Sequence, residues 1–498
     1  MGDSASATKN NVFTEGNWLP VREEKTVTDL AVTGEIPDFL DGRYLRNGPN
    51  PAEEIDPDAF HLFTGAGMVH GVRVRDGRAE WYRNRWVRSP AMAALLGESY
   101  TGKPSPAPMP DFGANTNVIG HAGRYFALVE AGAGNYELNG DLDTVGGCDF
   151  DGTLDAGFTA HPKRDPRTGE LHAVSYYFGW GNQVRYQVID AAGRVRRTVD
   201  IPIGGPGMMH DFSLTENYVV LYDLPVAFDL GLVTGPPPAQ APAADGVPAL
   251  SAPAKLVLST VRGRVEVPSP VPGQTQRSGG GFPYRWHADY PARIGVMPRE
   301  GGAADVRWFD IEPCYVFHPL NAYDTDAGTI VLDVVRYDKV FDRDTRGPSE
   351  GHPSLFRWTV DLQSGKVSQE QLDDRTQEFP RVDERVVGRR HRYGYAPRFL
   401  EGDDGLGPSQ LLKHDLDRGT AQARSFGAGR EPGEFVFVPR SADAAEDDGV
   451  LMGFVYDAAR DRSDLVLLDA AGLETVAAIH LPVRVPNGFH GNWIPDGQ

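Results

Sequence analysis

The sequence is poor in cysteine, in basic residues and in long apolar runs, and each shortage excludes a class of protein. Only two of its 498 residues are cysteine, which argues against a disulfide framework and predicts reduced thiols in the cytoplasm. Acidic residues outnumber basic ones by 69 to 49. The resulting net charge of -20 argues against nucleic acid as a partner and against attachment to anionic lipid by charge alone.

Signals for export, membrane insertion and zinc binding are also missing. The sequence has no run of about 18 apolar residues that would span a bilayer, and the polar residues 1–11 lack the apolar stretch of a secretory signal. Neither His-Glu-x-x-His nor Cys-x-x-Cys occurs, which argues against a zinc peptidase or a zinc ribbon. We expect a cytoplasmic protein whose residues 1–15 form a disordered tail.

Glycine and proline, by contrast, are abundant and divide the chain into short pieces. The 58 glycines and 39 prolines separate strand-like runs rich in β-branched and aromatic residues, at 125–130, 171–177, 218–222, 329–335, 450–456 and 465–468. Long amphipathic helices are few, and 89–96 is one short candidate. So many strands without a linker exceed an ordinary sandwich and favour a propeller, which grows by adding blades. The expected fold is an all-β propeller forming a single domain over residues 1–498.

One segment differs from the rest in composition. Residues 231–253 are rich in proline and alanine and almost uncharged. We interpret them as a surface insertion of biased composition. The alternative is an apolar lip over a lipophilic substrate.

Four of the 13 histidines stand in distinctive short phrases. They are His161 in Phe-Thr-Ala-His-Pro, His210 in Met-Met-His-Asp-Phe, His318 in Phe-His-Pro-Leu-Asn-Ala and His490 in Gly-Phe-His-Gly. These segments are too far apart for one helix or loop, but the inner strands of separate propeller blades converge on one axis. Four imidazoles meeting there would suit a borderline transition metal such as iron(II). The alternative is that each is a hydrogen-bonded core residue, and the phrases taken singly leave both possibilities open.

The remaining histidines offer weaker sites. His61 and His70 flank a glycine-rich turn, and we expect both to be structural. His287-Ala288-Asp289 has the spacing that begins a two-histidine, one-carboxylate iron site, but no third ligand can be identified downstream. The others adjoin polar or turn residues and are expected at the surface or in structural roles: His121, His172, His352, His391, His414 and His480.

The phrases around the four histidines resemble the carotenoid cleavage oxygenases, a family that includes apocarotenoid oxygenases, stilbene-cleaving dioxygenases and the retinoid isomerohydrolase. The resemblance begins at Gly42-Arg-Tyr-Leu-Arg-Asn-Gly-Pro-Asn-Pro51 and closes with Arg484-Val-Pro-Asn-Gly-Phe-His-Gly491. Between these ends it includes residues 115–118, 378–380 and 436–439. Several separated motifs in the same order make the resemblance specific, and the chain is most similar to the actinobacterial members.

The resemblance implies a seven-bladed propeller capped by a dome of loops and helices, with Fe(2+) on its axis. The implied metal ligands are His161, His210, His318 and His490. Three glutamates that orient three of these imidazoles in the family fall on Glu130, Glu378 and Glu434. This agrees with the physics, because an imidazole that binds metal through one nitrogen needs an acceptor for its other N–H. Thr116 matches a threonine beside the position left open for dioxygen, and packing within a strand is its alternative role.

The residue before Glu130 bears on the substrate. Stilbene-cleaving relatives carry a lysine there that reads the phenol, whereas this chain has Val129. An apolar side chain favours a hydrophobic polyene, although Tyr100 could match the tyrosine that accompanies that lysine. The substrate tunnel is expected to be lined by Phe63, Tyr100, Phe112, Val129, Phe158, Phe317 and Phe489.

The activity implied by the resemblance is cleavage of a conjugated carbon–carbon double bond of a carotenoid or apocarotenoid by O₂, which gives two carbonyl products. Iron is the only cofactor expected, and the partners are the lipophilic polyene and dioxygen. We expect a monomer that contacts membranes transiently through apolar dome residues. Three alternatives remain open: a stilbene- or phenylpropene-cleaving dioxygenase of the same fold, an isomerohydrolase, and a non-enzymatic propeller that binds a partner.

Overall fold

The computed structural model describes residues 11–496 except 59, 110–112, 230–231, 233–281, 349 and 400–407. The expected tunnel residue Phe112 and nearly all of the 231–253 insertion lie outside the described residues, so both expectations stay predictions. Secondary structure in the described part is almost all β. The helical elements that can be bounded within the described residues are α1 (Pro90–Leu95) and the 3-10 turns η1 (Val12–Thr14), η2 (Gly16–Trp18), η3 (Phe178–Trp180), η4 (Ala303–Asp305) and η5 (Glu384–Val386).

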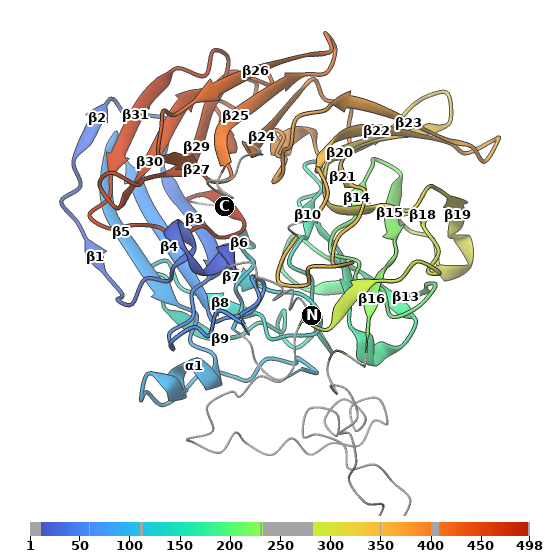
Figure 1. Ribbon diagram of the computed structural model, residues 1–498, viewed down its shortest axis with the longest axis horizontal. Helices are drawn as coiled ribbons and strands as arrows, with labels where there is room; N and C mark the ends of the chain where they lie inside the picture. The colour runs from blue at the N-terminus through green and yellow to red at the C-terminus, as the bar shows by residue number, and fades with distance from the viewer. Residues whose placement is uncertain are drawn as a thin grey trace, which may run out of the picture.

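Seven antiparallel sheets follow one another around a common axis as the blades of a propeller (Figure 1). The first comprises β1 (Thr26–Val27), β5 (Arg78–Trp86), β4 (Gly67–Arg75), β3 (Gly42–Pro49) and β32 (Gly491–Pro495). The second comprises β6 (Asn117–His121), β7 (Arg124–Leu128), β8 (Tyr136–Leu138) and β9 (Thr144–Gly147). The third comprises β10 (Lys163–Arg164), β11 (Leu171–Tyr176), β12 (Gln183–Ile189) and β13 (Val195–Pro202).

The fourth sheet comprises β14 (Ser213–Leu214), β15 (Tyr218–Asp223), β18 (Arg293–Pro298) and β19 (Arg307–Asp310). The fifth comprises β20 (Tyr315–Asp324), β21 (Thr329–Tyr337), β22 (Ser354–Asp361) and β23 (Val367–Asp373), and the sixth β24 (Tyr393–Phe399), β25 (Pro408–Asp415) and β26 (Thr420–Ser425). The seventh comprises β2 (Val32–Gly34), β31 (Thr475–His480), β30 (Arg462–Asp469), β29 (Gly449–Asp457), β27 (Arg430–Pro432) and β28 (Val436–Pro439). A separate pair joins β16 (Val226–Phe228) and β17 (Tyr284–Trp286).

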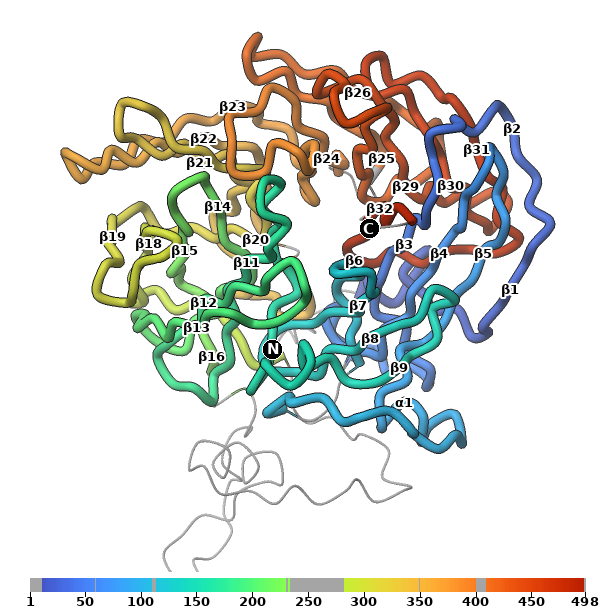
Figure 2. Tube along the Cα trace, turned by 180° about the vertical axis from the view of Figure 1, so that it is seen from behind, coloured from blue at the N-terminus to red at the C-terminus, as the bar shows by residue number. Residues whose placement is uncertain are grey.

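The two ends of the chain close the ring twice. β32 pairs with β3, so that the last strand completes the first blade, and β2 pairs with β31, so that an early strand completes the last blade. The first and last blades therefore lie side by side, blue beside red in Figure 2. Both pairings join a strand from one end of the sequence to a strand from the other end. Separating the first and last blades would therefore break both sets of hydrogen bonds.

The blades bury both faces of their middle strands, which explains the continuous apolar runs in the sequence. Residues 330–335 of β21 are all buried, including Asp333, whose carboxylate accepts two 2.8 Å hydrogen bonds from Arg357. Each of the six predicted strand-like runs overlaps an observed strand, and α1 begins after Ser89, whose hydroxyl accepts from Met92 N at 3.0 Å. The propeller fold is confirmed, and the dome stays a prediction. Within the described residues no helix is long and apolar enough to cross a membrane.

The predicted disordered tail spans residues 1–15, of which 1–10 lie outside the described residues and 11–15 have a defined conformation. They form η1 and its flanks, and the Phe13 side chain is 6% exposed. Phe13 meets Trp18 edge to face at 5.2 Å and belongs to a hydrophobic cluster with Leu62 and Phe489. The burial of these rings anchors the segment, and composition at the polar N-terminus does not reveal it.

Candidate metal centre

Four blades each contribute one histidine close to the axis. His161 comes shortly before β10 and His210 before β14, whereas His318 lies within β20 and His490 immediately precedes β32. Each of these strands stands at one end of its sheet order. β10, β14 and β20 lie on the inner side of their blades in Figure 1, and β32 does so in Figure 2. The fold therefore brings together the four segments that the sequence keeps apart.

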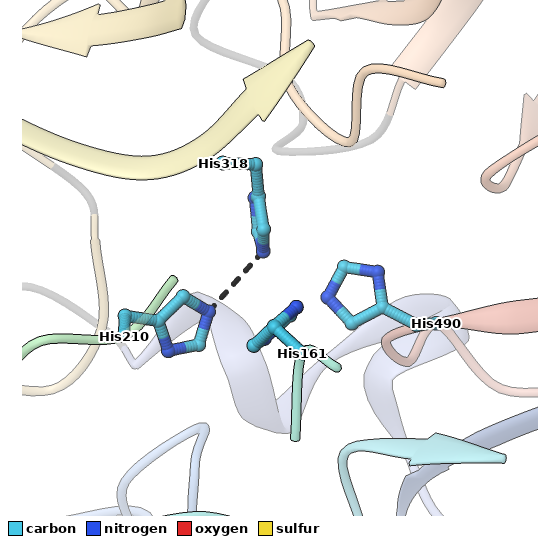
Figure 3. Close-up of side chains that lie close together, drawn as sticks. All are labelled: His161, His210, His318 and His490. Atoms are coloured by element: carbon cyan, nitrogen blue, oxygen red, sulfur yellow. Dashed lines mark hydrogen bonds between the residues drawn. The ribbon is translucent and has the colours of Figure 1, made fainter. Parts of the chain in front are cut away.

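The four imidazoles point towards one another (Figure 3). One ring nitrogen from each residue lies within 4.8 Å of the other three, and all four residues are buried. Nε2 of His210 is 3.2 Å from Nε2 of His318. The His161 ring centroid is 4.3 Å from that of His210 and 4.6 Å from that of His490. Within the described chain, no other cluster of histidine, cysteine or carboxylate side chains has this ligand geometry.

Three buried or nearly buried glutamates hold the outward nitrogens of three of these rings. Nδ1 of His210 is 2.8 Å from Glu130 Oε1, Nδ1 of His318 is 2.6 Å from Glu378 Oε2, and Nδ1 of His490 is 2.9 Å from Glu434 Oε1. When Nδ1–H donates to a carboxylate, the neutral ring keeps its lone pair on Nε2. The Nε2 lone pairs of His210 and His318 then face each other at 3.2 Å, and a cation between them relieves the repulsion.

His161 differs because it has no glutamate partner. Its Nε2 is buried without a hydrogen-bond partner, and its Nδ1 lies 3.9 Å from Asp211 Oδ2. The Asp211 carboxylate forms an ion pair with Lys163, whose Nζ is 3.0 Å from Oδ1. Burial, followed by the neighbouring His210, His490 and His318, lowers the pKa of His161 well below its ordinary value. The ring is therefore neutral and available as a donor. Four converging imidazole nitrogens, one of them buried without a hydrogen-bond partner, fit a transition metal.

The carboxylates are in turn fixed by groups that the sequence did not identify. Burial raises the pKa of Glu434, but Arg381, whose Nη1 is 3.4 Å from Oε1, and His490 outweigh it and bring the value to about 2. Gly491 N donates to the other oxygen at 2.8 Å. At Glu378, the hydroxyl of Tyr337 donates at 3.2 Å, and burial followed by Glu378 raises the pKa of Tyr337 well above its ordinary value. Tyr337 thus keeps its proton and stays a hydrogen-bond donor to Glu378.

Phe379 is a further residue at the site that sequence reasoning missed. Its ring stacks on His318 at 5.4 Å and meets His490 edge to face at 5.3 Å. Its φ of 53° lies in the left-handed region, which is unusual for a bulky residue and is typical of functional sites. The Glu-Phe-Pro phrase marks the position, but the backbone conformation that aims the ring cannot be read from the sequence.

Three of the predicted tunnel residues gather beside the histidines. The Phe63 ring is 6.5 Å from His210, 6.0 Å from Phe317 and 5.6 Å from Phe489. Phe317 is itself 5.2 Å from His210. These rings form an apolar wall on one side of the centre.

The other tunnel candidates lie elsewhere or remain untested. Phe158 is fully buried in a blade core and packs against Phe150 at 5.1 Å, so its place in the tunnel stays a prediction. Val129 lies in a hydrophobic cluster with Ala133 and Tyr136, and the Tyr100 hydroxyl donates to Lys103 O at 2.6 Å. The assignment of Val129 and Tyr100 to the tunnel stays a prediction.

Thr116 is connected to a ligand through its backbone. Its carbonyl oxygen accepts from His490 N at 3.0 Å, and its own N–H donates to Leu128 O at 3.0 Å. The Thr116 hydroxyl donates to Asn115 Oδ1 at 3.0 Å. The residue therefore supports the His490 segment, which adds a structural role to the one expected at the dioxygen position.

His61 and His70 have the environments of structural histidines. His61 Nδ1 accepts from Phe63 N at 3.0 Å and the ring stacks on Phe282 at 4.0 Å. His70 Nδ1 is 2.9 Å from the Tyr82 hydroxyl. Neither His287 nor Asp289 belongs to the metal-type cluster found among the described residues, so the alternative two-histidine site has no geometric support.

Comparison with known proteins covers nearly the whole chain. A family model described as retinal pigment epithelial membrane protein matches residues 18–495. A carotenoid cleavage oxygenase of Mycobacterium tuberculosis is 54% identical over 99% of this chain and 100% of its own length.

Two solved structures share the fold over almost the same extent. A lignostilbene dioxygenase of Pseudomonas brassicacearum has a TM-score of 0.79 at 28% identity, covering 97% of this chain and 98% of that one. A cobalt-substituted apocarotenoid oxygenase of Synechocystis has a TM-score of 0.77 at 26% identity, again covering 97% and 98%. With its blades, its buried four-histidine centre and these full-length similarities, the chain belongs to the carotenoid cleavage oxygenase family of enzymes.

Proposed function

We propose that this protein is a non-haem iron(II) dioxygenase that cleaves a conjugated double bond of a carotenoid or apocarotenoid. The observation that carries the proposal is the convergence of four buried imidazoles, three of them backed by glutamates. The 54% identity to a carotenoid cleavage oxygenase supports the substrate class. One O₂ and one carbon–carbon double bond give two carbonyl products, so atoms balance without a further reductant.

The protein's own residues hold the metal, orient its ligands and shield the reacting double bond from water. Iron(II), when bound by His161, His210, His318 and His490, supplies the capacity to activate dioxygen. Glu130, Glu378 and Glu434 fix the rings and offset the dicationic charge. No side chain needs to transfer a proton in this reaction, so the remaining task is to position one double bond in a site that excludes water.

We assign that positioning role to the aromatic wall of Phe63, Phe317 and Phe489, together with Phe379. Phe63 lies 6.0 Å from Phe317 and 5.6 Å from Phe489, and Phe379 stacks on His318 at 5.4 Å. Together these rings present a hydrophobic face that suits a polyene and excludes water. Thr116 is proposed beside the reaction position, from which its backbone also supports His490.

A substrate panel tests the function directly. With iron-loaded protein in air, we expect β-apo-carotenals to be cleaved to two carbonyl products identified by mass, and resveratrol and isoeugenol to react far more slowly. In the same assay Phe63→Ala should lower kcat/KM for the polyene about fivefold, the equivalent of one aromatic contact, with bound metal unchanged.

The opposite selectivity would favour the second candidate, a stilbene-cleaving dioxygenase, which the structural similarity to lignostilbene dioxygenase supports. Val129 favours the polyene, because a buried apolar side chain replaces the lysine expected of a phenol-reading site. Turnover of stilbenes without turnover of apocarotenals would therefore overturn our choice. Isomerisation of a retinyl ester without aldehyde products would instead indicate the isomerohydrolase alternative.

We further propose a cytoplasmic monomer that collects its substrate by transient membrane contact. Leu95 in α1 is 48% exposed and Val145 in β9 is 54% exposed, and both figures place α1 beside β9. Two exposed apolar side chains on one rim suit weak insertion between lipid headgroups. If carotenoid-loaded liposomes carry no protein on flotation, this contact does not occur.

A further inference from the structure

An N-terminal segment crosses the molecule close to the metal centre without joining a blade. This strap, residues 11–20, contains η1 and η2 and buries Phe13 and Asn17. Asn17 is only 3% exposed, which is unusual for a residue with an amide side chain. Burial of this kind requires hydrogen-bond partners, and most of them come from the opposite end of the sequence.

The hydrogen-bond partners of Asn17 lie in the loop that leads to His490. Asn17 Nδ2 donates to Val485 O at 3.2 Å and to Asn487 Oδ1 at 2.8 Å. Asn487 N donates back to Asn17 O at 2.7 Å. Three hydrogen bonds therefore join the strap to the loop of residues 485–489, which is followed immediately by His490.

Two further contacts extend this junction on either side. The Arg484 side chain donates to Leu19 O and to Pro20 O, the second at 3.3 Å. The Phe489 ring lies in one hydrophobic cluster with Phe13 of the strap. The strap thus contacts the loop at Val485, Asn487 and Phe489, and Arg484 just before it.

The loop has little freedom to relax in another way. A side chain at Gly488 would collide with the Arg46 guanidinium, which itself donates to Pro486 O. Phe489 N donates to Asn47 O at 3.0 Å, and His490 N donates to Thr116 O at 3.0 Å. In a loop packed this closely, displacement of Asn487 is transmitted to the imidazole three residues away.

The strap also forms one wall of a cavity of about 50 Å³ beside the centre. Asn17 and Trp18 line it together with Phe379, Glu434 and Phe489. A space of this size admits a few water molecules. Without the strap this cavity would open, and water would compete for the hydrogen bond between Glu434 and His490.

We propose that the strap is part of the metal centre, with Asn17 as a positioning residue that acts on His490 through residues 485–489. It holds the ring at its coordinating position and limits water access to Glu434. The proposal rests on the four-histidine metal site and not on the identity of the substrate.

The test compares Asn17→Ala with Asn50→Ala. Asn50 is a buried amide that binds Val21 N and Val21 O, both at 2.8 Å, and so anchors the same N-terminal stretch without contacting the loop. Each protein is loaded with Co²⁺ or Fe²⁺ and challenged with a chelator, and thermal unfolding of the metal-free form is measured in parallel. We expect Asn17→Ala to lose metal about tenfold faster than the wild type and to change the Co²⁺ visible spectrum.

The control separates positioning from stability. Asn50→Ala should lower the midpoint of thermal unfolding comparably but keep the wild-type rate of metal loss and the wild-type spectrum. Equal rates of metal loss in the two variants, or a wild-type rate in Asn17→Ala, would overturn the proposal. Should Asn17→Ala not fold, Asn487→Ala removes the same 2.8 Å hydrogen bond from the loop side and is judged by the same rate and spectrum. A wild type that binds metal but cleaves no polyene would contradict the proposed function and leave this result standing.

Discussion

Replacing His210 by alanine is expected to remove bound metal from the protein and to reduce polyene cleavage to background. The variant lacks one of four converging nitrogens, and it leaves Glu130 without the Nδ1–H that it accepts at 2.8 Å. Loss of a residue that only supports a ligand lowers metal affinity about 10–100-fold, so loss of the ligand should exceed that range. Metal content by elemental analysis and product formation by mass spectrometry measure the two effects.

His172→Ala is the matched control for this variant. His172 is also buried, in β11 of the third blade, and its Nδ1 is 2.7 Å from the Tyr186 hydroxyl, yet it does not belong to the four-histidine cluster. It should cost stability but keep stoichiometric metal. Stoichiometric metal in His210→Ala would contradict the site, and a wild type without metal would favour a non-enzymatic propeller.

Replacing Glu434 by alanine is expected to have the second largest effect, on both metal affinity and stability. The carboxylate holds His490 Nδ1 at 2.9 Å, Gly491 N at 2.8 Å and Arg381 at 3.4 Å. Metal affinity should fall about 10–100-fold because the His490 ring loses its orientation. The free energy of unfolding should fall by about 3 kcal/mol, because the buried Arg381 loses its inner partner. Competitive metal titration and denaturant unfolding of the metal-free protein measure these changes.

Asp333→Asn provides the comparison, since Asp333 is buried between Arg357 and His391 in a similar trio away from the metal ligands. It should lose stability and keep metal affinity, and an equal loss of affinity there would attribute the Glu434 effect to general destabilisation.

The pKa of Glu434, about 2, lies below its ordinary 4.5. Its ionised form therefore stabilises the fold above about pH 4.5, and this contribution is lost as pH falls towards 2. The stability difference between wild type and Glu434→Gln should shrink over that interval.

Much of the site could be predicted from short phrases because the residues that bind metal must be of particular types. His161, His210, His318 and His490 supply the imidazole nitrogens that suit a transition-metal centre. Glu130, Glu378 and Glu434 follow as the acceptors that such rings require. The structure brings each of them to the ring that needs it.

Prediction was weaker wherever a contact depends on packing between distant segments. Phe158 stands three residues before His161 in the sequence, but its side chain packs in a blade core. Arg381 and Phe379 adjoin a predicted glutamate, yet their roles depend on a 3.4 Å approach to Glu434 and on a left-handed φ. Residues 11–15 were expected to belong to a disordered tail, and their composition does not reveal the burial of Phe13 beside Leu62 and Phe489.

By itself the sequence determined the chemistry and the class of fold: nitrogen donors, carboxylate partners and many short strands without a linker. These properties follow from residue type and local periodicity, which each segment carries with it. Only the tertiary structure decided which nitrogen faces the centre, which aromatic rings surround it and that residues 11–20 support the fourth ligand. The contact between the strap and the loop before His490 depends on the closure of the ring by β32 and β2, which places Asn17 beside Asn487. No local pattern encodes that contact, because it forms only when the first and last blades meet.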